Sequence, residues 1–237
     1  MRLVPAVVPF VAAAALASCA SAPRDDGPAA FSTAAGAIGD FAVPVASVED
    51  RRFATVVRQR YDFSCGSAAL ATLLRFHYDQ RQDEAQVFRG MWTEGDRPQI
   101  RRLGFSLLDM KRYLGAIGIE ADGFQVTLDE VAQAGVPGIA LIDVNGYRHF
   151  VVVKGVTDQE VLVGDPALGL RTMAADEFRA AWNGVYFALN SRLATGRAAF
   201  NRDAQWASFS RAPLGAGFAN PLSQQALMLT SPFYGEF

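Results

Sequence analysis

The chain is poor in the residues that build covalent cross-links and metal sites. Its 237 residues include two cysteines and two histidines, too few for a disulfide-rich scaffold or for a zinc site made of these side chains. It also lacks a basic excess: the formal net charge is -2, and no run of lysine and arginine is present that would neutralise a phosphate backbone. These absences predict that the protein uses no metal and no cofactor, and that it does not bind nucleic acid.

The chain also lacks an apolar run long enough to cross a bilayer comfortably. The apolar stretch at residues 3–16 follows a positively charged start and is typical of a signal peptide. It closes with Leu16-Ala17-Ser18-Cys19, which looks like the lipobox of bacterial lipoproteins, in which the cysteine thiol takes a diacylglycerol. We expect residues 1–19 to be a signal peptide with a lipobox and Cys19 to be lipidated. The small residues Ala20-Ser21-Ala22 leave ordinary signal cleavage open.

Either kind of cleavage predicts an exported protein. The expected location is the periplasm, with a lipid anchor in the outer membrane as the one membrane contact. Residues 20–45 are rich in Ala, Gly, Pro and Ser and are expected to form a flexible tether. The chain is 51% hydrophobic, enough for one substantial core, which we place at residues 46–190. Residues 191–237 have no clear period, and we predict no structure for this C-terminal extension.

Apolar spacing predicts helices in the first part of the domain and strands in the second. Ser64 is a good N-cap for a helix in whose first turn Cys65 lies. Asn145-Gly146 between two apolar runs predicts a two-residue hairpin. The expected elements are a helix from residue 64, helices at about 82–90, 106–117 and 127–134, strands at 138–144, 147–156 and 160–164, a short helix near 176–182, and a strand at 185–189. Helices first and antiparallel strands second make an α+β fold.

Cys65 is the first candidate for chemistry. If Cys19 is acylated or removed, Cys65 is the remaining thiol of an exported chain, where an unpaired thiol is a liability unless it has a task. In the first turn of a helix it lies in the field of unsatisfied N–H groups, which favour the thiolate over the thiol. We hypothesise that Cys65 is a nucleophile; the alternative is that it is a buried, inert cysteine.

A thiolate nucleophile needs a base that becomes an imidazolium, and the chain offers His77 and His149. His77 is on the same predicted helix as Cys65, roughly 18 Å further along its axis, so it cannot reach the thiol. We expect it at the surface or at the helix end. His149, on the strand at 147–156, is the candidate base. The alternative for His149 is a satisfied histidine of the core or the sheet edge.

The hairpin register indicates which carboxylate orients the histidine. Asp143 falls opposite Arg148, so we expect these two to form a cross-strand ion pair that faces away from His149. If residues 157–159 form a three-residue loop, Asp165 lies diagonal to His149 on the same face of the sheet. Asp165 is therefore the candidate orienting group, and an ordinary Asp-Pro turn is the alternative.

Four sequence elements together resemble the peptidase C39 family in content, order and spacing. They are Gln59, Tyr61-Asp62-Phe63-Ser64-Cys65-Gly66, His149-Phe150-Val151-Val152-Val153 and Asp165-Pro166-Ala167-Leu168-Gly169. The resemblance covers roughly residues 50–190. It implies a papain-like fold in which the N-terminal helical part carries the catalytic Cys65 and the antiparallel sheet carries His149 and Asp165, with Gln59 in the oxyanion hole. Many relatives have aspartate where this chain has Ser64, a departure that bears on how the cysteine is activated.

The expected function is a cell-envelope cysteine endopeptidase that cleaves a secreted or exported protein substrate. The stand-alone exported form is similar to C39-like peptidases that accompany functional-amyloid secretion clusters, which implies an amyloid subunit or a component of the secretion system as substrate. Two alternatives stay open. One is a non-cleaving C39-like domain that binds the substrate of a secretion system, and the other is a papain-like peptidoglycan hydrolase.

Overall fold

The computed structural model describes residues 29–31, 41–43, 46–61 and 63–209, and it comprises two units, residues 1–47 and 48–237. In the first unit, β1 (Ala29–Phe31) pairs antiparallel with β2 (Phe41–Val43). The predicted signal peptide, Cys19 and most of the predicted tether lie outside the described residues. No helix within the described ranges is long and apolar enough to cross a membrane.

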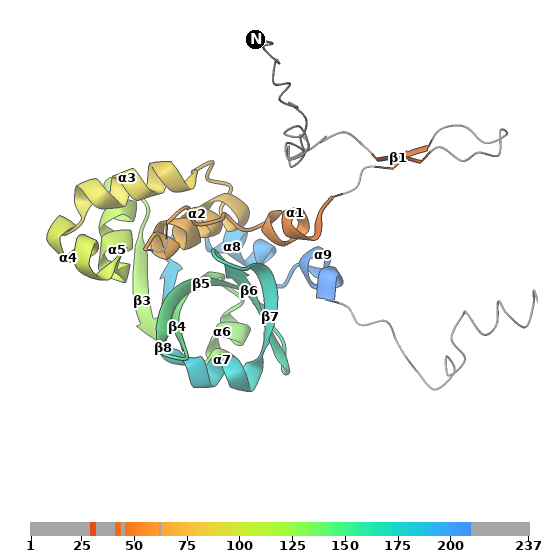
Figure 1. The fold of residues 1–237 in the computed structure, drawn as a ribbon. Helices are drawn as coiled ribbons and strands as arrows, with labels where there is room; N and C mark the ends of the chain where they lie inside the picture. Colours follow the sequence, from red (N-terminus) through yellow and green to blue (C-terminus); the bar gives the residue numbers. More distant parts are fainter. Residues whose placement is uncertain (1–28, 32–40, 44–45, 62, 210–237) are drawn as a thin grey trace, which may run out of the picture. The chain divides into compact units, whose positions relative to one another are not determined.

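The second unit confirms the predicted α+β class, with helices first and an antiparallel sheet second (Figure 1). The six-stranded sheet has the order β3-β8-β4-β5-β6-β7. Its strands are β3 (Ala121–Gln125), β4 (Gly138–Val144), β5 (Tyr147–Val156), β6 (Glu160–Asp165), β7 (Gly169–Ala174) and β8 (Trp182–Leu189). The helices are α1 (Val48–Phe53), α2 (Cys65–His77), α3 (Glu84–Glu94), α4 (Arg97–Leu103), α5 (Leu107–Ala116), α6 (Leu128–Ala134), α7 (Ala175–Ala181), α8 (Leu193–Ala199) and α9 (Asp203–Trp206), followed by a 3-10 turn at Ala207–Phe209.

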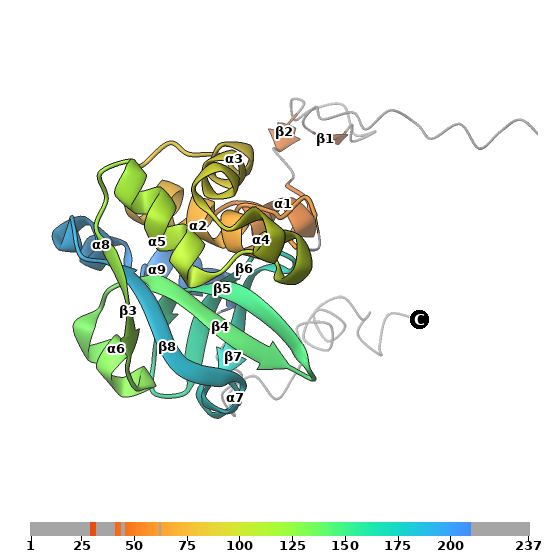
Figure 2. The ribbon, with the colours of Figure 1, turned by 90° about the vertical axis from the view of Figure 1, so that its left-hand side faces the viewer.

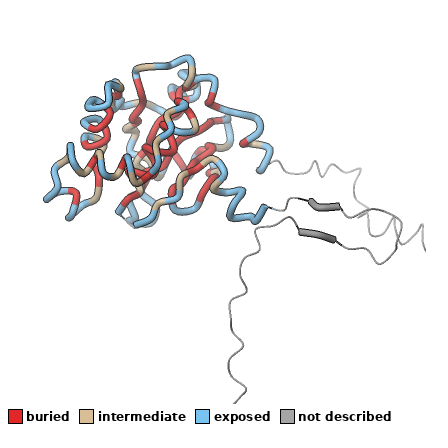
Figure 3. Tube along the Cα trace, turned by 90° about the horizontal axis from the view of Figure 1, so that it is seen from above, coloured by how far each residue is buried: buried red, intermediate tan, exposed pale blue. Residues whose placement is uncertain are grey.

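Helices cover the sheet on both sides, so the central strand β5 is buried on both faces (Figure 2). Phe150 and Val152 pack into the cluster that contains α2, α3 and α5, whereas Val151 and Val153 pack against α6 and α7. Burial on both faces explains why β5 reads as a nearly continuous apolar run and not as an alternating one. Figure 3 shows the buried residues gathered inside this unit.

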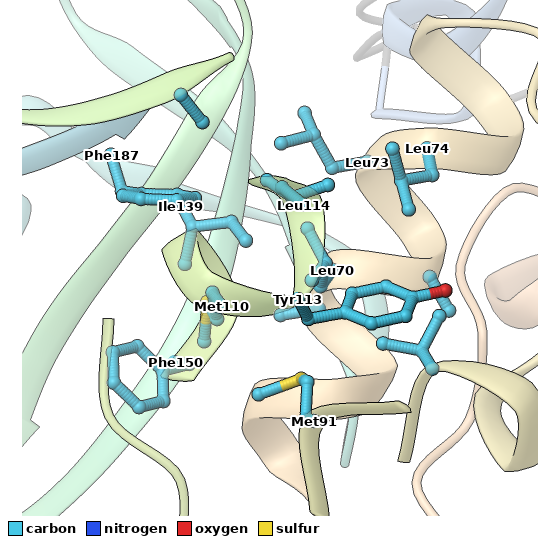
Figure 4. Close-up of a cluster of buried hydrophobic side chains, with 14 of the residues drawn as sticks. Leu70, Leu73, Leu74, Met91, Met110, Tyr113, Leu114, Ile139, Phe150 and Phe187 are labelled. Carbon is cyan, nitrogen blue, oxygen red and sulfur yellow. The ribbon is translucent and has the colours of Figure 1, made fainter. Parts of the chain in front are cut away.

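Helix α2 lies at the centre of the larger cluster. Leu70, Leu73 and Leu74 are fully buried and face Ile139 and Phe187 of the sheet (Figure 4). Burying each such side chain stabilises the fold by about 1.5–3 kcal/mol. The helix is therefore held firmly on the sheet, and this fixes the position of its N-terminus relative to β5.

The predicted hairpin between β4 and β5 is formed. Asn145 and Gly146 have positive φ angles of 56° and 84°, and Asp143 lies opposite Arg148. The predicted ion pair between these two was wrong. Asp143 Oδ1 instead accepts a hydrogen bond from the Gly146 N–H at 2.8 Å, because a donor within the turn is closer than the opposite side chain. Arg148 makes no ion pair with any described residue.

Some elements were not predicted from the sequence because they have little apolar periodicity. Among the residues of α4, Ile100 alone is buried, and in the edge strand β3 Ala121 alone is buried. Helices α8 and α9, in the extension for which no structure was predicted, are held by a side chain between them. Asn201 Oδ1 accepts from the Val156 N–H at 2.8 Å, and Asn201 Nδ2 donates to the Val156 carbonyl at 3.0 Å.

Candidate active site

Cys65 is the first residue of α2, as predicted, and its thiol is free and partly buried. Ser64 occupies the N-cap position, but the prediction that it caps the helix was wrong, because its side chain makes no capping bond. Its hydroxyl donates to Glu84 at 2.6 Å, and a bond to a carboxylate is stronger than a bond to a neutral group. In the first turn of α2, the Gly66 N–H interacts with the Cys65 sulfur and helps to lower the pKa of the thiol.

Glu84, the first residue of α3, holds the segment that precedes the nucleophile. It is 5% exposed, and its Oε1 accepts from the Ser64 hydroxyl and from the Arg60 N–H at 3.1 Å. The Tyr61 N–H donates to the Ser64 oxygen at 3.1 Å, which closes the turn. This buried carboxylate thus fixes the loop between Gln59 and Cys65. Sequence reasoning missed it, since no pattern links Ser64 to a residue 20 positions further along the chain.

His149 on β5 and Asp165 at the end of β6 are brought together, as predicted. The His149 Nε2 and Asp165 Oδ1 atoms are 2.7 Å apart, and the two residues are 4% and 2% exposed. The ring of Tyr147 stacks on the imidazole, with 5.6 Å between ring centroids and 27° between planes. Asp165 and Tyr147 together hold the imidazole in one orientation where β5 begins and β6 ends.

The register that places Asp165 on this face arises differently from the prediction. Val156 opposes Val161 and not Glu160, so the connection between β5 and β6 is one residue longer than expected. A longer connection alone would turn Asp165 to the opposite face. A β-bulge between Val153 and Gly155 takes up the extra residue and restores the expected register further along the ladder.

The Asp165 carboxylate is fully engaged in hydrogen bonds. Besides His149, its Oδ1 accepts from the N–H groups of Ala167 at 2.9 Å and Leu168 at 3.2 Å, and its Oδ2 accepts from Arg171 Nε at 3.2 Å. Asp165 therefore closes an Asp-Pro turn and also binds the histidine, so both interpretations of the motif hold. Arg171 was missed because β7, which carries it, was not predicted.

Cys65, His149 and Asp165 shift one another's pKa toward the charged forms. Burial raises the pKa of the Cys65 thiol, but the contact with His149 and the N–H groups of Phe150 and Gly66 lower it more, so the net pKa is below its ordinary value. Burial opposes the charged form of His149, yet Asp165 and Cys65 raise its pKa to about 9. Burial raises the pKa of Asp165, but the hydrogen bond and charge of His149, the Ala167 N–H and the charge of Arg171 together lower it more, so the net pKa is below its ordinary value. The site therefore favours a thiolate beside an imidazolium.

The second ring nitrogen of His149 completes this arrangement. The Nε2 atom of His149 is hydrogen-bonded to Asp165, whereas its Nδ1 atom is buried without a hydrogen bond of normal geometry. Because Cys65 and His149 shift each other's pKa, Nδ1 is the ring atom available to the thiol. A contact that is loose without substrate and tightens when substrate binds is common in catalytic sites.

Gln59 is joined to the Asp165–Pro166 segment by a backbone hydrogen bond. Its N–H donates to the Pro166 carbonyl at 3.0 Å, which fixes Gln59 next to the Asp165 turn. The side-chain Oε1 is buried and has no hydrogen-bond partner among the described residues. Within the described chain, the Gln59 side-chain amide makes no hydrogen bond to Cys65, and its place in the oxyanion hole stays a prediction.

His77 lies at the other end of α2, as predicted, but it is buried and not at the surface. It is 1% exposed, and neither ring nitrogen makes a hydrogen bond of normal geometry to a described residue. Burial, assisted by the charges of Lys154 and Arg202, lowers the pKa of His77 well below its ordinary value. His77 is therefore neutral and separate from the site at Cys65.

An open cleft of about 770 Å³ adjoins Cys65. One wall consists of α4 and the start of α5, and the other consists of the end of the β4–β5 hairpin. The lining residues are Phe63, Cys65, Gln99, Arg101, Arg102, Leu103, Gly104, Phe105, Ser106, Leu107, Leu108, Leu141, Tyr147, Arg148 and Phe150. A cleft of this size accommodates a polypeptide segment next to the thiol.

The sequence model described as the Peptidase C39 family matches residues 54–193, which include Gln59, Cys65, His149 and Asp165. The chain belongs to this family. Among curated relatives, the "Probable functional amyloid protease FapD" of Pseudomonas fluorescens and that of Pseudomonas aeruginosa are each 45% identical over 145 residues. Each alignment covers 61% of this chain and 64% of the relative, so the chain spans less than two thirds of these relatives' length.

Solved peptidase structures are also similar to this chain. One is a double glycine motif protease from an AMS/PCAT transporter, crystallised in complex with the leader peptide. It is 25% identical, with a TM-score of 0.48, and the match covers 56% of this chain and 89% of that chain.

Proposed function

We propose that this C39-family chain is a cysteine endopeptidase of the cell envelope that cleaves a polypeptide handled by a functional-amyloid secretion system. The observation that carries the proposal is the buried His149–Asp165 pair at 2.7 Å, placed so that it lowers the pKa of a thiol at a helix N-terminus. The 45% identity to proteins named as functional amyloid proteases supports the substrate class.

In the proposed reaction, the Cys65 thiolate attacks the carbonyl carbon of the scissile peptide bond, and the carbonyl electron pair moves onto its oxygen. The backbone N–H groups at the start of α2 and the Gln59 amide stabilise this oxyanion. The His149 imidazolium then gives its proton to the leaving amine, and the C–N bond breaks to leave a thioester on Cys65. Water, deprotonated by His149, hydrolyses the thioester and regenerates the thiolate.

Asp165 orients His149 and keeps the ring protonated in the resting enzyme. The four hydrogen bonds to its carboxylate hold it ionised, and its charge favours the imidazolium. Arg171 supports the same carboxylate from β7, 3.2 Å from Oδ2. Both residues act on His149 and not on the substrate.

The envelope location is proposed from the sequence. The apolar stretch at residues 3–16 and the lipobox-like Leu16-Ala17-Ser18-Cys19 support export, acylation of Cys19 and anchoring in the outer membrane, with residues 20–45 as a tether. Fractionation of cells that carry Cys19→Ala tests this. The variant should move from the membrane fraction to the soluble periplasmic fraction, and its continued membrane association would contradict the anchor.

The activity is tested by comparing the secreted and envelope proteins of a strain that carries Cys65→Ala with those of the parent. We expect at least one substrate to accumulate in a longer form in the variant. An identical pattern in both strains, with Cys65→Ala present and folded, would contradict the proposal and favour a non-cleaving binding domain. Release of soluble muropeptides from purified sacculi by the wild type, but not by Cys65→Ala, would instead favour a peptidoglycan hydrolase.

A further inference from the structure

The cleft beside Cys65 carries charge of one sign. Among its lining residues, Arg101 and Arg102 come from α4, and Arg148 comes from β5. No acidic side chain lines this cleft in the described chain. The chain as a whole has a formal net charge of -2, so the positive charge is local to the cleft and does not follow from composition.

Two of these arginines form no ion pair within the part of the chain that the structure describes. Arg101 lies over the Trp92 ring, 5.4 Å from its centroid, but Arg102 and Arg148 form no ion pair with a described residue. The carboxylate opposite Arg148, that of Asp143, is bound instead to the Gly146 N–H. Arg148 is therefore exposed and unneutralised immediately before His149 in the strand.

Part of this charge has a structural explanation. Cations in the last turn of a helix complement its dipole, and Arg101 and Arg102 are in the last turn of α4. That explanation does not extend to Arg148, which is on a strand. The two unpaired guanidinium groups come from opposite walls of one cleft, and this arrangement fits a ligand that carries negative charge between them.

We propose that the cleft selects substrates with acidic residues close to the scissile bond, through Arg102 on one wall and Arg148 on the other. The inference rests on the proposed peptidase function and specifies its substrate class. An extended polypeptide directs successive side chains to opposite sides. Neighbouring acidic residues therefore reach the two walls in turn, while the exposed Leu103, Leu108 and Tyr147 contact apolar parts of the same segment.

The test is cleavage-site profiling with the full chain. A peptide library prepared by digesting a bacterial proteome is incubated with wild type, with Arg102→Glu/Arg148→Glu and with Arg81→Glu, and new N-termini are sequenced by mass spectrometry. Arg81 is the matched control, because it is an exposed arginine beyond the far end of α2 from Cys65. Labelling of Cys65 by a thiol-reactive probe reports the nucleophile separately in each variant.

We expect aspartate and glutamate to be enriched near the bonds that the wild type and Arg81→Glu cleave. The double variant should lose this enrichment and cleave acidic peptides roughly tenfold more slowly, with Cys65 labelling unchanged. The preference should weaken as salt is raised, since exposed charges are screened. Cleavage without acidic enrichment, or enrichment that persists in the double variant, would overturn the inference and leave the peptidase function intact. Absence of all cleavage and of Cys65 labelling would overturn both.

Discussion

Replacing Asp165 with asparagine tests how the resting site is charged. The substitution keeps the shape and leaves an oxygen that accepts from the N–H groups of Ala167 and Leu168, but it removes the charge that faces His149 at 2.7 Å. With this oxygen in the Oδ1 position, the NH2 group takes the place of Oδ2 and faces Arg171 Nε, which is a donor in the wild type. Asp165→Asn therefore removes the stabilisation of the imidazolium with little change in volume.

The free energy that Asp165→Asn removes can be worked out from the pKa of His149. It is raised from 6.5 to about 9, and each unit corresponds to about 1.4 kcal/mol in favour of the charged ring. Asp165 and Cys65 share this effect, and Asp165 is its leading favourable cause. If Asp165 supplies somewhat more than half, about 2 kcal/mol is lost, and the thiolate–imidazolium pair becomes roughly thirtyfold less populated relative to the neutral pair.

The assay is the pH dependence of kcat/KM and of Cys65 alkylation. The ion pair forms as pH rises through the lowered pKa of Cys65 and is lost as pH rises through the pKa of His149. The alkaline limb should therefore move from near pH 9 in the wild type to about pH 7.5 in Asp165→Asn, because about 2 kcal/mol corresponds to about 1.5 pH units. Asp158→Asn, in the exposed turn after β5, is the matched control. A folded Asp165→Asn protein whose pH profile coincides with that of the wild type would refute the reasoning.

Substitutions at four further positions test the loop before the nucleophile, the surroundings of two glycines and the burial of a lysine. Glu84→Ala removes the acceptor that holds the loop before the nucleophile. The free energy of unfolding should fall by about 1–3 kcal/mol, and alkylation of Cys65 should slow. Unchanged alkylation would show that other contacts hold the loop. Gly90→Ala should lower the free energy of unfolding by about 1–3 kcal/mol in chemical denaturation, because its Cβ would overlap the Tyr113 ring. Gly115→Ala, which has open space around it, should be neutral or stabilising, and equal effects of the two substitutions would contradict the packing. Burial lowers the pKa of Lys154 to about 7, so the unfolded chain binds a proton there that the folded chain lacks. Stability should therefore rise by at most about 2.7 kcal/mol between pH 7 and 9 in wild type relative to Lys154→Met, and parallel stability curves would contradict this.

The parts of the fold that follow from local chemistry were predictable from the sequence. The hairpin at Asn145-Gly146 and its register depend on residues adjacent in the chain, and the structure confirms both. The position of Cys65 at the start of α2 likewise follows from the apolar spacing behind it. The pairing of His149 with Asp165 was predicted because it needs only the alternation of two neighbouring strands.

The remaining features depend on contacts that no local pattern encodes. The bulge at Val153 and Gly155 compensates for a longer turn, so the face of Asp165 was predicted correctly from an incorrect loop length. Ser64 has the propensity of an N-cap, but the tertiary contact with Glu84 takes its hydroxyl. Competition between a local and a distant partner is decided by the assembled fold and not by propensity.

The pKa of the Cys65 thiol is the most direct test of whether Cys65 is an activated nucleophile. Thiolate absorbance is recorded during a pH titration of the full chain, and the titration of Cys65→Ala is subtracted so that the difference reports Cys65 alone. We expect this thiolate to form at a pH below the ordinary cysteine pKa of about 8.5, and His149→Ala to abolish the shift. A thiolate that forms only at or above that value, whether or not His149 is present, would contradict the assignment of Cys65 as an activated nucleophile.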